Sequence, residues 1–337
     1  MKILVNCCGY FSDGLDTPTR GEGRWTQNIA RFLSEVGHDV YACTGGTVVH
    51  GTGRPSPAKL VELPEAVRNG PYDMYFDCCW TAGKKPMAPA KKYFHVTWWP
   101  EARFFSEGLP ENHYVCYFLN TVRHLFTDRN INVNVDRTFF LPTPYCKTMA
   151  EPAFDNNGLL WCSRIFKPEE HPGRPSIEEN YRYGQIVLDI AGELITEFPD
   201  LILTGLYKDF SADLKFPKSV LHNLIPYHAF LKLLQRTKLS LPVRMQSCIF
   251  DCTAAGVPFL AWEDTQLPGQ EFIDVARKHG VLIEKGASKD RVKEVILTLL
   301  TNKEVYTMYT KDMQYVLRHH TEGEVLKCFQ HIVDSVF

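Results

Sequence analysis

The stretch Asp251-Cys252-Thr253-Ala254-Ala255-Gly256-Val257-Pro258, followed by Phe259-Leu260-Ala261, joins small residues to an apolar segment through Gly-Val-Pro. This pattern predicts a helix over Cys248–Ala255 that ends at Gly256, and a buried strand over Val257–Trp262. A short helix that leads directly into an apolar strand is typical of α/β domains.

The surrounding second half of the chain continues this alternation. A helix is predicted from Pro175 to about Phe198, with a capping box in Pro175-Ser176-Ile177-Glu178-Glu179. The other predicted elements are strands over Leu159–Cys162, Leu201–Leu206, Val220–Leu224 and Leu239–Val243, and helices that start near His228, Gln270, Lys289, Val305 and Val325.

The first half of the chain shows the same organisation. Apolar runs predict strands that are buried on both faces of a parallel sheet, over Ile3–Val5, Asp39–Thr44, Met74–Trp80, Tyr93–Trp98 and Tyr114–Leu119. A polar, glycine-containing loop from Gly9 to Gly23 precedes an amphipathic helix that Gly37 closes. These elements predict a Rossmann-like domain.

The length of 337 residues fits two domains of roughly 150 residues each. The pattern breaks around Pro142, Pro144 and Pro152, which predicts an interdomain connector over residues 146–157. The expected organisation is a first domain over 1–145, a second over 158–320 and a C-terminal helix over 321–337. The predicted fold class is therefore α/β, with two tandem doubly wound Rossmann-like domains that face a cleft.

Composition narrows the function classes. The net charge of −2 does not indicate a nucleic-acid or membrane partner through the overall field, although a local basic patch stays compatible with it. The 11 cysteines include no pair of CxxC motifs, which favours reduced thiols. No signal peptide and no apolar run of about 20 residues are visible. We expect a soluble cytoplasmic protein, in the host cytoplasm if it is phage-encoded.

The stretch from Asp251 to Pro258 resembles the donor-site motif of GT-B glycosyltransferases, Glu-Ala-Met-Ala-x-Gly-x-Pro. The resemblance implies that Asp251 binds the ribose hydroxyls of a nucleotide diphosphate-sugar, since a carboxylate accepts two hydrogen bonds from a cis-diol. The alternative is an ordinary helix N-terminus whose Asp favours the macrodipole. Val243 occupies the position of a second Glu found in many members, so retaining and inverting mechanisms both stay open.

The same resemblance implies further donor-binding residues. Arg164 and Lys167 follow the first strand of the second domain, where the family clamps the diphosphate, although they could equally be solvated surface cations. Ile225 lies in the loop whose backbone meets the nucleotide base in that family. Gly21, Glu22 and Gly23 resemble the glycine-rich loop whose N–H groups face phosphate and sugar.

Three first-domain residues at or after strand ends are candidates for the catalytic base: Asp77, His95 and Glu101. A histidine can deprotonate a hydroxyl near neutral pH. The alternative for His95 is a hydrogen-bonded core histidine. The sequence does not choose among the three.

An aromatic and basic stretch nearby contains the candidate acceptor-binding residues Trp98, Trp99 and Arg103, with Lys91 and Lys92 close in sequence. Within GT-B enzymes the layout is similar to phage DNA β-glucosyltransferase, which implies UDP-glucose as donor, a hydroxymethylated base in DNA as acceptor, and a divalent metal. We expect no tightly bound cofactor. The alternatives are transfer to a glycan, lipid or small molecule, a nucleotide-sugar epimerase, and a noncatalytic sugar-binding or nucleic-acid-binding protein.

Overall fold

The computed structural model describes residues 1–337 except 8–20, 45–57, 79–87, 98–108, 119–134, 207–213, 218–219, 223–224, 244–247, 264–268, Arg164, Phe166, His171 and Pro226. Of Cys7, residues 21–24, Thr44, Thr97, Val135 and Tyr227 only the backbone is described. The chain forms two compact units: unit 1 contains Met1–Lys147 and His319–Phe337, and unit 2 contains Thr148–Arg318.

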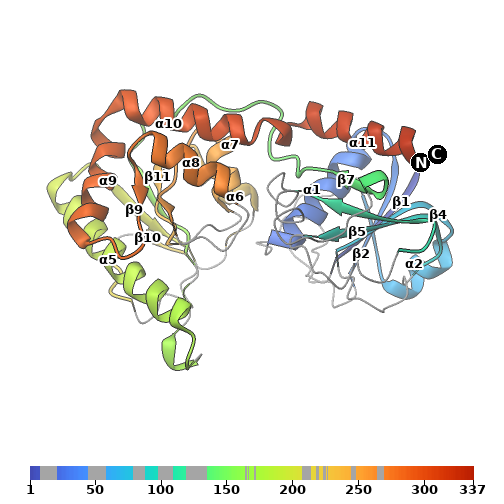
Figure 1. Ribbon diagram of the computed structural model, residues 1–337, viewed down its shortest axis with the longest axis horizontal. Coiled ribbons are helices and arrows are strands. Elements are labelled where there is room, and N and C mark those ends of the chain that lie inside the picture. Colours follow the sequence, from blue (N-terminus) through green and yellow to red (C-terminus); the bar gives the residue numbers. More distant parts are fainter. Residues whose placement is uncertain are drawn as a thin grey trace. The chain divides into compact units, whose positions relative to one another are not determined.

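Unit 1 is built on a seven-stranded parallel sheet in the order β3-β2-β1-β4-β5-β6-β7 (Figure 1). The strands are β1 (Lys2–Cys7), β2 (Asp39–Thr44), β3 (Lys59–Val61), β4 (Tyr72–Asp77), β5 (Ala90–Thr97), β6 (His113–Tyr117) and β7 (Thr138–Phe140). The order reverses between β1 and β4, which makes this pair the topological switch point of the sheet.

Helices cover both faces of this sheet. α1 (Gly21–Glu35) and α11 (Glu322–Val336) lie on one face, where Trp25 packs 6.2 Å from Phe76 and His331 packs 6.1 Å from Phe139, both measured between ring centroids. On the opposite face, α2 (Leu63–Asn69) packs through Ala66 against an apolar cluster that includes Tyr75. The sheet is therefore the middle layer of a three-layer unit.

Unit 2 repeats the same strand order. Its strands are β8 (Gly158–Trp161), β9 (Ile202–Gly205), β10 (Val220–Leu221), β11 (Thr237–Ser240), β12 (Ala261–Trp262) and β13 (Leu282–Ile283). Four of them pair in the order β10-β9-β8-β11, β12 pairs with β13, and a parallel bridge from Ser240 to Phe259 links the two groups. The switch point of unit 2 is therefore the pair β8 and β11.

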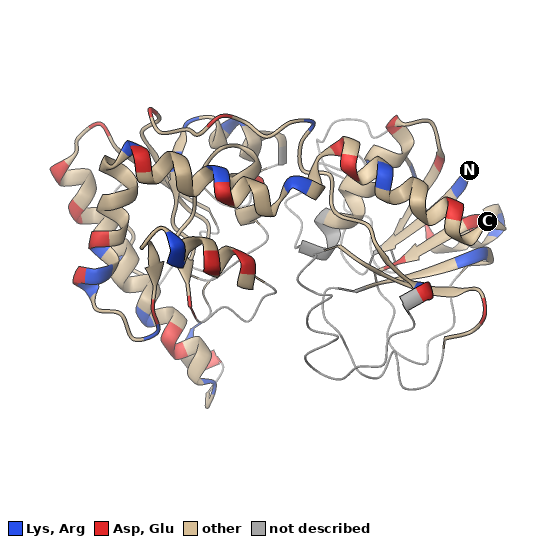
Figure 2. Ribbon diagram, turned by 45° about the horizontal axis from the view of Figure 1, so that its top comes forward, with Lys and Arg blue, Asp and Glu red and all other residues tan. Residues whose placement is uncertain are grey.

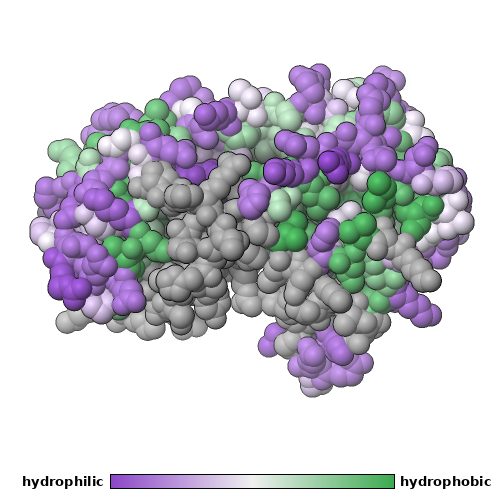
Figure 3. Space-filling view, turned by 180° about the vertical axis from the view of Figure 1, so that it is seen from behind, coloured by the Kyte–Doolittle hydropathy of each residue, from purple (hydrophilic) through white to green (hydrophobic). Residues whose placement is uncertain are grey.

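The helices of unit 2 are α5 (Pro175–Glu197), α6 (Tyr227–Leu234), α7 (Cys248–Ala254), α8 (Gln270–Lys278), α9 (Lys289–Thr301) and α10 (Lys303–Val316), with the 3₁₀ turn η2 (Pro168–Glu170) before α5. α6 and α7 bury Phe230, Leu234 and Cys252 against Leu160 of β8. Part of the surface of this unit is apolar, as the hydrophobic side chains on the right of Figure 3 show. Ile202 and Val220 are among its exposed apolar residues.

The predicted fold class of two doubly wound Rossmann-like domains is confirmed by the strand orders of the two units. The predicted capping box at the start of α5 is wrong. The helix begins at Pro175 after Arg174, whose side chain makes no capping hydrogen bond, so Ser176 lies inside the first turn. Strands β3, β7 and β13 were not predicted, because a strand of three residues or fewer carries too little periodicity. Helix α2 was not predicted either. Among the described residues no helix is long and apolar enough to cross a membrane.

Candidate functional site

Ligands of doubly wound sheets bind outside the carboxyl ends of the strands at the switch point. In unit 1 three polar side chains occupy this place on neighbouring strands. Asn6 of β1 is in register with Asp77 of β4, and Asp77 is in register with His95 of β5. We call these residues the polar row. They are 1%, 5% and 4% exposed, respectively, at sheet positions where apolar side chains are the rule.

The carboxylate of Asp77 accepts a hydrogen bond on each oxygen. The amide Nδ2 of Asn6 donates to Oδ1 at 3.1 Å, and the hydroxyl of Tyr75 donates to Oδ2 at 3.2 Å. Hydrogen bonds to a carboxylate favour its ionised form. Burial raises the pKa of the nearby Cys43 thiol to about 11, and the negative charge of Asp77 adds to this shift. The row thus contains one anchored carboxylate.

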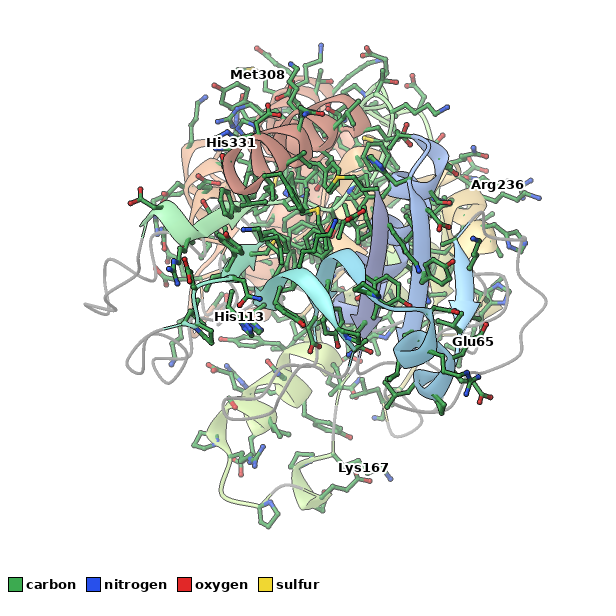
Figure 4. The ribbon with its side chains drawn as sticks, turned by 90° about the vertical axis from the view of Figure 1, so that its right-hand side faces the viewer. Glu65, His113, Lys167, Arg236, Met308 and His331 are labelled. Carbon is green, nitrogen blue, oxygen red and sulfur yellow. The ribbon has the colours of Figure 1, made fainter. Side chains whose placement is uncertain are left out.

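His95 is held from the other side by a histidine of β6. Its Nε2 lies 2.8 Å from Nδ1 of His113, and the two rings stack with centroids 5.0 Å apart. Burial, reinforced by the neighbouring His113, lowers the pKa of His95 to about 3, and burial also lowers the pKa of His113. Both rings are therefore neutral at pH 7. Figure 4 shows His113 and His331 on opposite sides of the sheet, His331 on α11.

The other predicted residues of unit 1 are only partly described. Gly21, Glu22 and Gly23 form the first turn of α1 rather than a loop, and their side chains lie outside the description. Glu101, Trp98, Trp99 and Arg103 also lie outside the described residues.

Lys91 and Lys92 lie at the amino end of β5, away from the carboxyl end where the polar row stands. Lys91 Nζ forms an ion pair with Asp73 at 2.7 Å, and Lys92 Nζ donates to the hydroxyl of Tyr114 at 3.2 Å. The structure therefore does not bring these two lysines to the carboxyl edge of the sheet.

At the switch point of unit 2, short polar side chains and the backbone connect β8 to β11 through hydrogen bonds. The backbone N–H of Val243, just after β11, donates to Oγ of Ser163, just after β8, at 2.6 Å. One step earlier, Cys162 Sγ lies 3.3 Å from Ser240 Oγ. Ser163 is fully buried and Val243 nearly so. Arg164, which follows immediately, lies outside the described residues.

Helix α7 presents Asp251 in this unit. The residue is 2% exposed. The helix ends as predicted at Gly256, whose φ is +76° and whose N–H donates to Thr253 O while the N–H of Val257 donates to Cys252 O. These two bonds form a Schellman motif. A Cβ at Gly256 would stand 2.1 Å from Glu151 O, so only glycine fits.

Two other predicted donor residues are described. Ile225 packs against the buried cluster that contains Cys252 of α7. The loop predicted to contact the nucleobase and helix α7 therefore share one apolar cluster. Lys167 is exposed and directly precedes η2, and its side chain points outward in Figure 4. Among the described residues no group of three or more His, Cys, Asp or Glu side chains could hold a metal ion.

Solved sugar-nucleotide enzymes have the same fold. Alr3699/HepE of Anabaena, solved with UDP-glucose, has a TM-score of 0.57 at 9% identity and matches 100% of this chain and 99% of that chain. The spinosyn forosaminyltransferase SpnP has a TM-score of 0.52 at 11% identity and matches 99% of both chains. A Listeria monocytogenes protein assigned as a UDP-N-acetylglucosamine 2-epimerase has a TM-score of 0.52 at 12% identity, over 92% of this chain and 90% of that chain.

The chain has the GT-B fold. It spans only 54% of the length of S. aureus TarM. No protein-family model matches the sequence, and a search of curated proteins finds no match. Identities of 14% or less establish the fold and not the activity, which has to be argued from the site.

The structure adds four residues that the sequence did not single out: Asn6, Tyr75, His113 and Ser163. Two of them carried a detectable signal. Asn6 is a polar residue that ends the apolar run of β1, and Ser163 is the small polar residue between Cys162 and Arg164. Tyr75 and His113 lie within apolar strands and carried none.

Proposed function

We propose that the protein transfers a sugar from a nucleotide diphosphate-sugar to a hydroxyl acceptor. In this proposal the catalytic base lies in unit 1 and most of the donor-binding residues lie in unit 2. The observation that carries this proposal is the buried Asp77 carboxylate at the switch point of unit 1, in a fold shared with sugar-nucleotide enzymes. A buried carboxylate at the carboxyl edge of a parallel sheet is expensive to maintain unless it serves a site.

Among the three candidate bases, the described geometry favours Asp77 over His95. A base must accept a proton, and burial with a low pKa of about 3 disfavours the charged form of His95. Asp77 in contrast is acceptor-only when ionised. In the proposed step Asp77 takes the proton of the acceptor hydroxyl, the acceptor oxygen bonds to the anomeric carbon, and the bond to the diphosphate breaks with its electron pair on the leaving group. This direct displacement inverts the anomeric configuration.

For the donor we propose UDP-glucose or a related UDP-sugar, since Alr3699/HepE was solved with UDP-glucose. In this proposal Asp251 binds the ribose hydroxyls, and Arg164 and Lys167 neutralise the diphosphate. The backbone at Ile225 contacts the nucleobase. The cluster shared by Ile225 and α7 supports this arrangement, because it holds two of the proposed contacts in one packed region. The turn Gly21–Gly23 at the N-terminus of α1 provides N–H groups for phosphate or sugar in the same proposal.

For the acceptor, the sequence layout suggests a hydroxymethylated base in DNA, contacted by Trp98, Trp99 and Arg103. Figure 2 shows basic and acidic residues interspersed on the helices of both units, and Lys91 is neutralised by Asp73. DNA is therefore one acceptor to be tested beside glycans, lipids and small molecules.

An epimerase is a second candidate, because the Listeria protein assigned to that activity matches the chain as well as SpnP does, with a TM-score of 0.52 for each. An epimerase converts the donor without an acceptor. A noncatalytic binding protein would bind the donor and leave it unchanged.

The decisive experiment offers UDP-glucose and other nucleotide sugars to the full chain, with and without acceptors that include hydroxymethylated DNA. A thermal-shift screen comes first, since a ligand at 100 times its dissociation constant should stabilise the fold by about 2.7 kcal/mol. Nucleotide release that depends on an acceptor supports transfer. Conversion without an acceptor identifies the epimerase, and binding without turnover identifies the noncatalytic alternative.

A further inference from the structure

One described contact of Asp77 comes from a residue far away in the sequence, and the other comes from its own strand. Asn6 on β1 reaches one carboxylate oxygen across a separation of 71 residues, and Tyr75 on the same strand as Asp77 reaches the other. Both contacts are donors, and both are buried. The amide of Asn6 is the single described side chain on the opposite strand of the switch point that donates to Asp77.

We propose that Asn6 is a positioning residue for sugar transfer, which fixes the carboxylate of Asp77 across the switch point and keeps it ionised as the acceptor's base. This inference rests on the proposed function. Asn6 acts through Asp77 and does not itself exchange a proton, since an amide neither gains nor loses one in this range of pH. The hydroxyl of Tyr75 has the same positioning role at the second oxygen of the Asp77 carboxylate.

The surroundings of Asp77 make this role specific. In register with the polar row or with the residues two positions before it, the titratable side chains of the described strands are Lys59 on β3, Tyr41 and Cys43 on β2, Tyr75 on β4, Tyr93 and His95 on β5, and His113 on β6. Burial keeps Cys43, His95 and His113 neutral at pH 7, because it raises the pKa of the thiol and lowers those of the two imidazoles. The described hydrogen bonds to the Asp77 carboxylate come from the neutral donors Asn6 and Tyr75, and both favour its ionised form.

The substitution Asn6→Asp tests the proposal with almost no change of shape. It replaces a donor by a second carboxylate at about the same distance, and two such carboxylates share one proton instead of both ionising. We expect the acid limb of the kcat profile to rise by about one pH unit or more, which is about a tenfold loss of kcat at a pH on that limb. The donor KM should stay within about twofold of wild type, because neither Asn6 nor Asp77 is among the proposed donor contacts.

Two further variants separate positioning from folding. Asn112→Asp makes the same chemical change just before β6, at the amino edge of the sheet, and should leave the profile unchanged. The exchange Asn6→Asp with Asp77→Asn restores one amide and one carboxylate to the pair. We expect it to recover the thermal stability lost by the single variants and not the transfer, since the carboxylate then stands on the wrong strand.

Three results overturn the proposal: a folded Asn6→Asp variant with the wild-type pH profile, the same shift in Asn112→Asp, or transfer restored by the exchange. The dependence of stability on pH gives a readout that needs no turnover. If wild type shows no turnover with any nucleotide sugar, the proposed function fails. In that case, a loss of stability in Asn6→Asp that is large at pH 7 and shrinks as pH falls supports the coupling of Asn6 to Asp77, because the paired carboxylates bind a proton more readily in the fold than in the unfolded chain. A loss that does not change with pH overturns it.

Discussion

At the switch point of unit 1 two side chains meet, the amide of Asn6 and the carboxylate of Asp77, whereas at that of unit 2 the hydroxyl of Ser163 meets the backbone N–H of Val243. Both points stand at the same place in the same strand order. One holds a charge-bearing group and the other is closed by a neutral contact beside a buried valine. Under the proposed function, proton transfer belongs to unit 1, and the hydrogen bond between Val243 and Ser163 joins the ends of the two central strands of unit 2.

The largest effect that would test this division is the loss of the base. Asp77→Asn should lower kcat by about 10²- to 10⁴-fold, the usual contribution of a general base, with an unchanged fold. Steady-state kinetics with the preferred donor and acceptor measure it. Asp73→Asn, the same change at the amino end of β4, serves as control. Wild-type kcat in Asp77→Asn would transfer the base role to Glu101 or to the donor phosphate.

A smaller effect is expected from the diphosphate clamp in unit 2. Lys167→Ala and Arg164→Ala should each lower kcat about tenfold to a thousandfold, and lower donor affinity less, because leaving-group charge grows in the transition state. The control is Lys311→Ala on α10. If both variants keep wild-type kcat, neither cation stabilises the leaving group.

Donor binding should depend on unit 2 and not on the polar row. Asp251→Ala should weaken the free energy of donor binding by about 1.5–3 kcal/mol, the range for a hydrogen bond to a charged group. Calorimetric titration measures this loss, and Asp251→Asn, which keeps the shape, separates charge from packing. Equal affinity in a folded Asp251→Ala protein would rule out the ribose role.

The last prediction concerns the free energy of unfolding and its dependence on pH. The pKa of His95 is about 3 in the fold and 6.5 as its ordinary value, and that of His320 in the same unit is about 4. A histidine with a lowered folded pKa is protonated first in the unfolded chain. Stability is therefore lost as pH falls from about 6.5 toward these folded values, by at most about 1.4 kcal/mol per pH unit and group.

Hydrogen exchange at pH 7 and pH 5 should show unit 1 losing protection before unit 2, and His95→Gln should reduce the difference. Equal losses of protection in the two units, or an unchanged difference in His95→Gln, would contradict the assignment of this pH dependence to the buried histidines of unit 1.

Several features of the protein follow from the sequence by itself. The alternation of apolar runs and helix-period segments predicted both α/β units, because burial on a strand or on a helix face leaves a local period. Gly256 predicted the end of α7 for an equally local reason, since a Schellman motif needs a positive φ at one residue. Asp77 and His95 were recognised as polar residues near strand ends.

Only the tertiary structure decided which of these residues meet. Asn6 and Asp77 are 71 residues apart, His95 and His113 are 18 apart, and Ser163 and Val243 are 80 apart. It also decided that α11, the end of the chain, belongs to unit 1, where His320 Nδ1 lies 3.0 Å from Thr143 O. The physical reason is that local periodicity specifies which face of a strand is buried, while strand order and register depend on the packing of the whole sheet.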